Sequence, residues 1–347
     1  MPAYRVVEWQ QPAQLVEAPV PSPGPGEVRI KVAANGLCHS DIGMTQIPGA
    51  FVEPIGWRVP FTLGHEVAGW VDELGAGVTG VELGTAVALV SPSSCGTCRY
   101  CVRGLEGACL HGGAGRGFGR DGGLAPYVVA RADRELIALD DLDPLVAGPL
   151  TDAGATAYHA VRRVLPRLRP GSTAVVLGSG GLGTFAVQFL RVLSPARVIA
   201  VDQSPTRRAV AQEFGAHEAI EGVGADTAEA LLELTDGFGA DAVLDFVGID
   251  ASITAGLRSV AVAGAFGLVG AAGGTFHGPW YGGFPKEADV FNFQSSSISD
   301  VREVFTLAKQ GLVRSEVDVF PLSSVEDGYA AMEAGTLRGR AVVTPDA

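Results

Sequence analysis

Four of the five cysteines in the chain lie within one short segment, CGTCRYCVRGLEGAC, at residues 95–109. Cys95, Cys98, Cys101 and Cys109 follow the spacing C-x2-C-x2-C-x7-C. The two-residue gaps allow one turn to bring thiolates to neighbouring corners of a tetrahedron, and four thiolates leave no coordination position open. The spacing therefore predicts a structural metal that holds a loop without a core of its own. Zinc is the natural choice, with an iron–sulfur cluster or disulfides as alternatives.

A second candidate site is the glycine-rich turn GSGGLG, at residues 178–183. The apolar segment TAVVL precedes this turn and TFAVQFLRVL follows it, which indicates a strand, a turn and a helix. The first glycine permits the tight turn, the second allows a pyrophosphate to approach, and the last lets the helix pack closely on the strand. The helix N-terminus stabilises the phosphates. The residues predicted to bind the dinucleotide here are Gly178, Gly180, Gly181, Leu182 and Gly183.

The choice of nucleotide depends on Asp202, which ends the segment RVIAVD 24 residues after Gly178. A carboxylate at the end of this second strand can accept both ribose hydroxyls and would repel a 2′-phosphate, so the sequence predicts NAD rather than NADP. The alternative is that Asp202 caps the helix that begins with SPTRR. Arg207 and Arg208 argue in the other direction, because either could pair with a 2′-phosphate.

The elements that must position these groups change in character near Thr151. Before it, alternating faces and Pro/Gly turns predict a β-rich region with strands at GEVRIKVAANG, EVAGWVDELG, TAVALV and LAPYVVA. After it, helical segments alternate with strands that are apolar throughout, which predicts a parallel sheet covered on both faces. Two later helices are predicted at about Val301–Gln310 and Val325–Glu333, followed by a terminal strand, RAVVTP.

Length and charge narrow the class of protein. A chain of 347 residues predicts two domains, and a net charge of −13 argues against partners such as nucleic acid or an anionic membrane. The N-terminus, MPAYRVVEWQ, lacks the pattern of a secretory signal, and no apolar run approaches the roughly 20 residues of a membrane span. We therefore expect a cytoplasmic protein, whose reduced thiols favour metal over disulfides at the cysteine loop.

The fifth cysteine and one histidine complete a larger pattern. Taken alone, Cys38 in GLCHSDIG and His65 in TLGHEVAGWVDELGAGV are typical of buried core residues. Together with the cysteine loop and the later nucleotide turn, they make the whole chain similar to the zinc-containing medium-chain alcohol dehydrogenase family. The segment GHEVAGWVDELGAGV, at residues 64–78, fits the zinc signature of that family, and the cysteine loop has its spacing.

The resemblance implies an α/β fold of two domains. A GroES-like, β-rich catalytic domain would span residues 1–152 and contain the structural-zinc loop at 95–109. A Rossmann domain with a doubly wound parallel sheet would bind NAD at residues 153–295, and residues 296–347 would return to complete the catalytic domain. The family also implies a homodimer or homotetramer formed through edge strands of the nucleotide domain, and the aromatic residues of AAGGTFHGPWYGGFP could serve that interface.

The resemblance further implies a catalytic zinc bound by Cys38 and His65. The third ligand is a cysteine in much of the family, but none remains here; some bacterial members use aspartate, and Asp152 in PLTDAGATAYHA occupies the matching segment. An alternative role for Asp152 is to cap the following helix. Glu66 would lie just outside the ligands, and Asp41 would accept the free ring N–H of His65.

Several other positions take roles from the resemblance. Ser40 matches the hydroxyl that takes the alcohol proton, and Gly43 stands where several relatives have the histidine that ends this proton relay. The three consecutive serines in VFNFQSSSIS, Ser295, Ser296 and Ser297, suggest a roomier or more polar substrate pocket, which a substrate panel would test. The further residues implied to contact the cofactor are His39, Thr156, Val247, Val269 and Arg340.

The function implied is reversible hydride transfer between NAD(H) and a primary or secondary alcohol or the matching aldehyde or ketone. A polyol or sugar dehydrogenase of the same superfamily is the first alternative. A zinc-ribbon binding protein without catalysis is a distant one, which the net charge of −13 opposes. A zinc-free quinone reductase would lack both the cysteine loop and the pair formed by Cys38 and His65.

Overall fold

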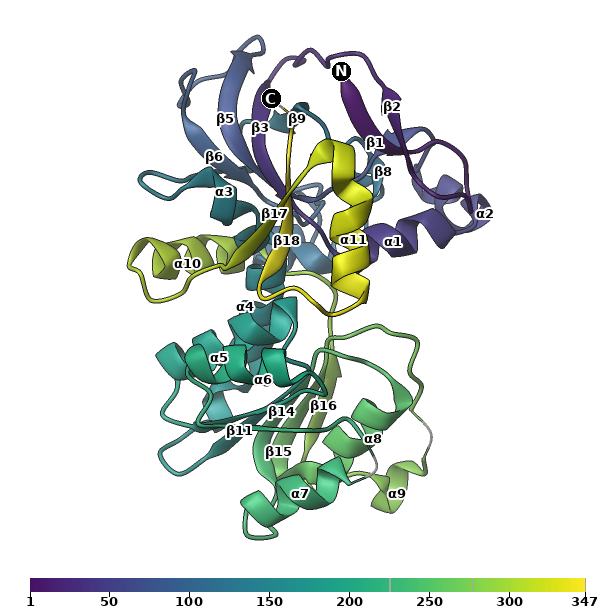
Figure 1. Cartoon of the computed structure of the whole chain (residues 1–347). Coiled ribbons are helices and arrows are strands. Elements are labelled where there is room, and N and C mark those ends of the chain that lie inside the picture. Colours follow the sequence, from purple (N-terminus) through teal and green to yellow (C-terminus); the bar gives the residue numbers. More distant parts are fainter. Residues whose placement is uncertain (225, 277, 347) are drawn as a thin grey trace. The chain divides into compact units, whose positions relative to one another are not determined.

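The computed structural model describes residues 1–224, 226–276 and 278–346, and the chain folds into two compact units (Figure 1). Unit 1 comprises Met1–Ala155 together with Ser295–Ala347, and unit 2 comprises Thr156–Gln294. Unit 1 is therefore built from both ends of the chain, and unit 2 is one continuous segment. Among the described residues, no helix combines the length and the apolar character that a membrane crossing requires.

Unit 1 contains a seven-stranded sheet in the order β10-β6-β5-β3-β18-β17, with β9 also paired to β3. The strands are β3 (Glu27–Gly36), β5 (Glu66–Leu74), β6 (Ala86–Leu89), β9 (Tyr127–Arg131), β10 (Leu136–Ala138), β17 (Val317–Pro321) and β18 (Arg340–Thr344). Along β3, Val28, Ile30 and Val32 are buried at alternate positions, as expected of a strand with one face toward a core. They pack with valines and leucines of β5 and β6, so the strands predicted in this region are confirmed.

The C-terminal segment enters the same sheet. Strand β18 lies antiparallel to β3, with Val342 opposite Gly36 and Val343 opposite Asn35. Two smaller sheets complete unit 1: β2-β1-β4, formed by Gln14–Glu17, Pro2–Val6 and Phe61–Thr62, and β7-β8, formed by Gly115–Arg116 and Gly119–Arg120. Residues near position 340 are thereby placed beside the strand that leads into Cys38.

The helices of unit 1 are short or peripheral. They are α1 (His39–Gln46), α2 (Gly49–Val52), α3 (Pro144–Ala147), α10 (Ile298–Lys309) and α11 (Val325–Glu333), with 3-10 turns η1 (Glu53–Ile55), η2 (Cys101–Arg103), η3 (Glu106–Ala108), η4 (Gly148–Thr151) and η6 (Leu322–Ser324). Helix α10 begins three residues before the expected start because Ser297 caps it, accepting a hydrogen bond from the backbone N–H of Asp300 at 3.1 Å.

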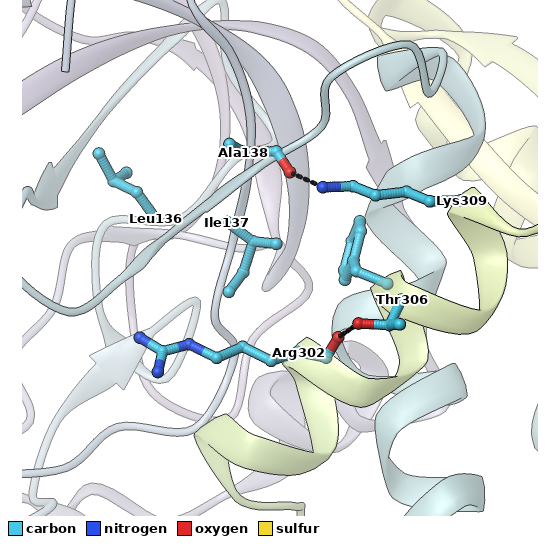
Figure 2. Close-up of a pocket in the computed structure, with 7 residues that line it drawn as sticks. Leu136, Ile137, Ala138, Arg302, Thr306 and Lys309 are labelled. Atoms are coloured by element: carbon cyan, nitrogen blue, oxygen red, sulfur yellow. Dashed lines mark hydrogen bonds between the residues drawn. The ribbon is translucent and has the colours of Figure 1, made fainter.

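A small pocket of about 280 Å³ lies between β10 and α10 (Figure 2). Its apolar wall includes Ile137 and Phe305, and Lys309 donates hydrogen bonds to the carbonyl of Ala138 at 2.8 Å and to Asp140 at 2.6 Å. None of the site residues predicted from the sequence lines this pocket.

Unit 2 is built on a six-stranded sheet in the order β13-β12-β11-β14-β15-β16, and every neighbouring pair is parallel. The strands are β11 (Thr173–Leu177), β12 (Arg197–Val201), β13 (Glu218–Ile220), β14 (Ala240–Asp245), β15 (Val260–Leu268) and β16 (Asp289–Asn292). All five residues of β11 are buried, as expected of a central strand covered on both faces. The predicted doubly wound parallel sheet is therefore confirmed.

Helices of unit 2 connect and cover the strands. They are α4 (Ala153–Val164), which begins just before the unit boundary, α5 (Gly181–Leu193), α6 (Pro205–Glu213), α7 (Thr227–Leu234), α8 (Asp250–Ser259) and α9 (Trp280–Gly283), with the turn η5 (Leu165–Arg167). Residues of α7 and α8 pack on one face of the sheet, where Leu231 and Ile253 meet Val243. The strand order changes direction at β11, which is where such sheets bind ligands beyond the carboxyl ends of their strands.

Candidate functional site

Four side chains that could bind a metal converge in unit 1. Cys38, His65, Glu66 and Asp152 each offer a ligand atom, and these atoms all lie within 4.8 Å of one another. Cys38 follows β3 and precedes α1, while Glu66 is the first residue of β5 and His65 directly precedes it. Because Gly36 of β3 pairs with Glu66 of β5, the two strand ends bring these residues together. Asp152 approaches from the end of η4.

His65 is held in one orientation by carboxylates on both sides of its ring. Nδ1 lies 3.1 Å from Oδ1 of Asp41, and Nε2 lies 3.4 Å from Oδ2 of Asp152. Burial alone would lower the pKa of His65, but the charge of Asp41 and hydrogen bonds with Asp152, Asp41 and Cys38 raise it well above 6.5. Asp41 also accepts the backbone N–H of Cys38 at 2.9 Å. The carboxylate of Asp41 therefore positions two of the predicted ligands, and its contact with the ring N–H of His65 is the one that the family resemblance implies.

Glu66 is fully buried and its two oxygens have different surroundings. Oε1 forms an ion pair with Nη2 of Arg340, whereas Oε2 has no hydrogen-bond partner among the described residues. Burial raises the pKa of Glu66 to about 7, although the charge of Arg340 opposes this shift. A side chain at Gly36 would meet Oε2 at 1.9 Å, so the glycine makes room for this carboxylate. The guanidinium of Arg340, predicted from the resemblance to lie near the cofactor, is thus bound to Glu66.

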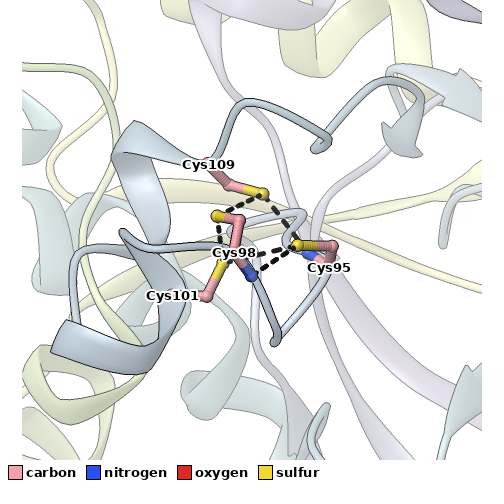
Figure 3. Close-up of side chains that lie close together, drawn as sticks. All are labelled: Cys95, Cys98, Cys101 and Cys109. Carbon is pink, nitrogen blue, oxygen red and sulfur yellow. Dashed lines mark hydrogen bonds between the residues drawn. The ribbon is translucent and has the colours of Figure 1, made fainter.

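The four loop cysteines gather as separate thiols (Figure 3). The Sγ atoms of Cys98 and Cys101 are 3.6 Å apart, those of Cys98 and Cys109 are 3.9 Å apart, and those of Cys95 and Cys101 are 4.0 Å apart. Tetrahedral zinc with bonds of about 2.3 Å would space its sulfur ligands roughly 3.8 Å apart. The group fits zinc in both donor type and spacing, and the separations are too long for disulfides.

Backbone N–H groups favour thiolates in this loop. Hydrogen bonds from the backbone of Thr97 and Cys98 lower the pKa of Cys95 to about 5. The N–H groups of Cys95 and His111 point at Sγ of Cys109, at 3.3 and 3.4 Å. Burial, in contrast, raises the pKa of Cys101 to about 12. Binding of a metal cation there would have to displace a proton.

The glycine turn of unit 2 has the geometry expected for a dinucleotide. Gly178 has a positive φ of +85°, and a side chain at Gly183 would meet the carbonyl oxygen of Gly178 at 1.9 Å. Asp202 lies against the turn, where Oδ2 accepts the N–H of Ser179 at 2.8 Å and Oδ1 accepts that of Ser204 at 2.9 Å. The cap of α6 is Ser204, whose side chain accepts from Arg207, so the capping alternative for Asp202 is not needed.

The two arginines that argued for NADP occupy different positions. Arg208 donates to the carbonyls of Asp202 and Gln203 and pairs with Glu221, so its guanidinium is committed within unit 2. Arg207 lies on α6, and its guanidinium carbon is 3.9 Å from the position that a Cβ atom would take at Gly180. Of these two side chains, Arg207 is the one nearer the glycine turn.

The remaining predicted residues fall on elements around these centres. His39 and Ser40 are in the first turn of α1, next to Cys38. In unit 2, Thr156 is on α4, and Val247 and Val269 follow β14 and β15. Val247 comes within 2.6 Å of the position a side chain at Gly178 would occupy, so it borders the glycine turn. Serines 296 and 297 are buried, and Ser297 is the helix cap described above; that the serines make the substrate pocket roomier or more polar stays a prediction.

Two aromatic residues near His65 were not predicted. The ring of Phe118 lies 4.6 Å from the imidazole, centroid to centroid, and Tyr329 of α11 is buried near Asp41. Phe118 stands in a glycine-rich loop with no periodic pattern, and Tyr329 is 288 residues from Asp41 in the sequence, so no local signal marks either residue.

Comparison with known proteins gives matches over both units. Residues 24–141 match the alcohol dehydrogenase GroES-like domain, and residues 181–310 match the zinc-binding dehydrogenase domain. An NAD-dependent alcohol dehydrogenase of Sulfurisphaera tokodaii is 34% identical over 99% of this chain and all of the relative. A D-arabinose 1-dehydrogenase (NADP(+)) of Saccharolobus solfataricus is 29% identical over 97% of this chain and 96% of its own length.

Solved structures show the same architecture. The crystal structure of the alcohol dehydrogenase from the archaeon Aeropyrum pernix superposes with a TM-score of 0.92 and is 32% identical, covering 99% of this chain and all of that one. The pairing of a GroES-like domain with a Rossmann domain, expected from the sequence, is therefore confirmed.

Proposed function

This chain belongs to the zinc-dependent medium-chain alcohol dehydrogenase family, and we propose that Cys38, His65 and Asp152 hold its catalytic zinc. The enzyme is an NAD-dependent alcohol dehydrogenase, which transfers hydride reversibly between NAD(H) and a primary or secondary alcohol or the matching carbonyl compound. The observation that carries the assignment of the site is the convergence of a thiol, an imidazole nitrogen and a carboxylate oxygen within 4.8 Å.

The donor atoms fit a catalytic zinc. Tetrahedral bonds of about 2.0–2.1 Å would place nitrogen and oxygen ligands roughly 3.3 Å apart, close to the 3.4 Å between Nε2 of His65 and Oδ2 of Asp152. Three protein ligands leave a fourth position for substrate, unlike the four-thiol loop. A thiolate and a carboxylate also balance the charge of a divalent cation. These features support a catalytic role here and a structural zinc at Cys95, Cys98, Cys101 and Cys109.

When bound, zinc supplies a Lewis acid that makes the alcohol proton easier to remove, and NAD accepts the hydride. The residues of the chain prepare this site. Asp41 accepts a hydrogen bond from Nδ1–H of His65, which keeps the proton on Nδ1 and leaves the lone pair of Nε2 facing Cys38 and Asp152. Ser40, two residues after Cys38, is proposed to receive the proton of the alcohol. Arg340 forms an ion pair with one oxygen of Glu66. This ion pair keeps the Glu66 carboxylate beside the three proposed zinc ligands, and Glu66 itself is not proposed as a ligand.

We expect NAD to be preferred over NADP because of Asp202. In the Asp202→Asn variant the side chain keeps an acceptor for Ser179 but loses the charge that repels a 2′-phosphate. The kcat/KM for NAD should fall about 10- to 100-fold, which is the effect of losing a hydrogen bond to a charged group. The ratio of kcat/KM for NAD to kcat/KM for NADP should therefore decrease. Steady-state kinetics with both cofactors measures this. The Glu233→Gln variant, a loss of charge at an exposed position of α7, is the control. A wild-type preference for NADP would contradict the role of Asp202.

The test of the proposed function combines metal analysis with a substrate panel. We expect two zinc ions per chain and NAD-dependent turnover of primary or secondary alcohols. A single zinc per chain would remove one of the two sites. The similarity to the D-arabinose 1-dehydrogenase favours a sugar dehydrogenase as the second candidate function. Faster turnover of aldoses than of simple alcohols would establish this second function.

We also propose a homo-oligomer in the cytoplasm. Strand β16 is the edge of the sheet in unit 2, and Val290 on it is 39% exposed, so the edge is available to pair with a second copy. A reducing compartment suits loop cysteines that bind zinc as thiolates. Light scattering on the purified enzyme should give the mass of a dimer or tetramer, and the mass of a monomer would refute this part of the proposal.

A further inference from the structure

A buried carboxylate ends strand β14, next to the glycine turn of unit 2. Asp245 is the last residue of β14, is fully buried, and lies opposite Leu177, the last residue of β11. These two strands meet where the strand order of the sheet changes direction, and Gly178 directly follows Leu177. Parallel sheets of this kind bind ligands beyond the carboxyl ends of their strands at such a point. Asp245 therefore lies where the sheet is expected to bind a nucleotide.

Neutral donors surround the side chain of Asp245. Oδ1 accepts the N–H groups of Val247 at 2.8 Å and of Gly248 at 3.0 Å, and Oδ2 accepts the hydroxyl of Ser252 at 2.7 Å. Burial raises the pKa of Asp245, and these three hydrogen bonds oppose that rise. Among the described residues, no cation pairs with this carboxylate. A buried carboxylate without a counter-ion is costly, so its hydrogen bonds indicate which structure it maintains.

The structure that the Asp245 side chain maintains is the turn at residues 246–248. Two consecutive N–H groups of this turn end on the same carboxylate oxygen, so the turn cannot change its backbone conformation without losing both hydrogen bonds. A methyl carbon of Val247 lies 2.6 Å from the position that a Cβ atom would take at Gly178. The turn after β14 therefore packs directly against the glycine turn.

The main chain of Asp245 is connected to a second turn. Its carbonyl oxygen accepts the N–H groups of Val269 and Gly270, both at 2.9 Å, and these two residues follow β15. A Cβ atom at Gly248 would meet the carbonyl oxygen of Gly270 at 2.1 Å, so the turns after β14 and β15 are in close backbone contact. One residue thereby links Val247 and Val269, the two valines that the family resemblance implies to contact the cofactor.

We propose that Asp245 is a positioning residue for NAD, which fixes the turn after β14 against the glycine turn and joins the turn after β15 to it. This inference rests on the proposed function, in which the dinucleotide binds at the glycine turn. The carboxylate is fully buried, so it acts through the backbone that it holds and not by contact with the cofactor.

The experiment compares Asp245→Ala with Asp245→Asn in the full-length, zinc-loaded enzyme. Alanine leaves the N–H groups of Val247 and Gly248 without their acceptor, whereas asparagine keeps an oxygen for them and an amide that can donate to Ser252. We expect the Kd for NADH, measured by the fluorescence of the bound nucleotide, to rise about tenfold in Asp245→Ala and to stay within about threefold of the wild type in Asp245→Asn. At saturating NAD, kcat should stay within about threefold of the wild type in both variants, because only cofactor binding is weakened.

A second measurement depends on neither the cofactor nor activity. Without nucleotide, hydrogen–deuterium exchange of the peptide that contains Val247 and Gly248 should be faster in Asp245→Ala than in the wild type and in Asp245→Asn. The Ser252→Ala variant removes the donor to Oδ2 but leaves both carboxylate oxygens in place. Its Kd for NADH should rise about threefold, and this variant keeps the test decisive if Asp245→Ala does not fold.

Asp241 provides a matched control on the same strand. It is the second residue of β14, and its Oδ2 accepts the N–H of Thr173, the first residue of β11, at 2.8 Å. The Asp241→Ala variant therefore removes the same kind of hydrogen bond at the opposite end of the same two strands. We expect this variant to have a lower Tm than the wild type but a Kd for NADH within about twofold of it.

The outcomes separate this inference from the proposed function. A wild-type enzyme that binds no NADH would refute the proposed function. A wild-type enzyme that binds NADH, together with a wild-type Kd in Asp245→Ala, or in Ser252→Ala if the alanine variant does not fold, would refute the role of Asp245 alone. Equal increases in Kd in Asp245→Ala and Asp241→Ala would refute that role as well, because the stability of the sheet would then determine the affinity. An Asp245→Asn variant that binds NADH as weakly as Asp245→Ala would also refute it, since the turn keeps its acceptor there.

Discussion

The Asp152→Asn variant should lose the catalytic zinc and nearly all activity. Asparagine keeps the size of the side chain but removes the negative charge that, with the Cys38 thiolate, balances the cation beside His65. Mutation of a residue that only hydrogen-bonds to a metal ligand typically lowers metal affinity or activity 10- to 100-fold. Loss of a ligand itself should therefore lower kcat/KM by roughly 1,000-fold or more. Zinc per chain, measured by mass spectrometry, should fall from two to one.

A second variant tests whether the loss of zinc is due to the loss of a ligand at position 152. Asp152→Cys supplies the thiolate that much of the family uses, so we expect it to retain two zinc ions and measurable activity. The exposed Asp141→Asn variant, a loss of charge elsewhere in the same segment, should behave as the wild type. An Asp152→Asn enzyme with two zinc ions and normal turnover would show that Asp152 is not a ligand, and its place at the start of α4 would then indicate a helix cap.

The second large effect is expected at the cysteine loop. The Cys98→Ser variant removes one of four thiols whose sulfurs lie 3.6–4.0 Å apart, and it should release the structural zinc. A cross-link that closes a loop of about 15 residues contributes on the order of 3 kcal/mol. For a unit of this size that corresponds to a decrease in Tm of about 6–12 °C. Calorimetry and zinc analysis measure the two effects together.

The Ser94→Ala variant is the control for this prediction, because it changes the residue next to the loop without removing a thiol. Ser94 accepts a hydrogen bond from Arg134 at 2.8 Å. It should keep two zinc ions, with a Tm within about 2 °C of the wild type. A Cys98→Ser enzyme that melts at the wild-type temperature would mean that the loop is held by its own packing, and the cysteine cluster would need another explanation.

The sequence was most informative where the relevant residues are neighbours. The cysteine loop and the glycine turn each lie within fifteen residues, and their spacing alone defines a donor set or a phosphate cradle. The apolar strands after Thr151 were recognisable because both faces of a parallel sheet are buried. In these three places the residues that define the structure are close together in the sequence, so their spacing or their apolar character is enough to predict it.

The rest depended on contacts between distant segments. Glu66 and Arg340 are 274 residues apart, and only the pairing of β18 with β3 brings the strand of Arg340 to the site. The start of α10 was placed three residues too late, because the cap formed by Ser297 was not recognised in the sequence. Such roles follow from tertiary pairing or capping geometry, which composition does not reveal.

The split construction of unit 1 has a consequence for biosynthesis. Unit 2 is encoded by one uninterrupted stretch, so its sheet can form as soon as that stretch leaves the ribosome. The sheet of unit 1 is completed only when β18, which follows unit 2 in the sequence, pairs with β3, which precedes unit 2. Unit 2 is therefore expected to mature first, and the sheet of unit 1 only after β18 has emerged from the ribosome.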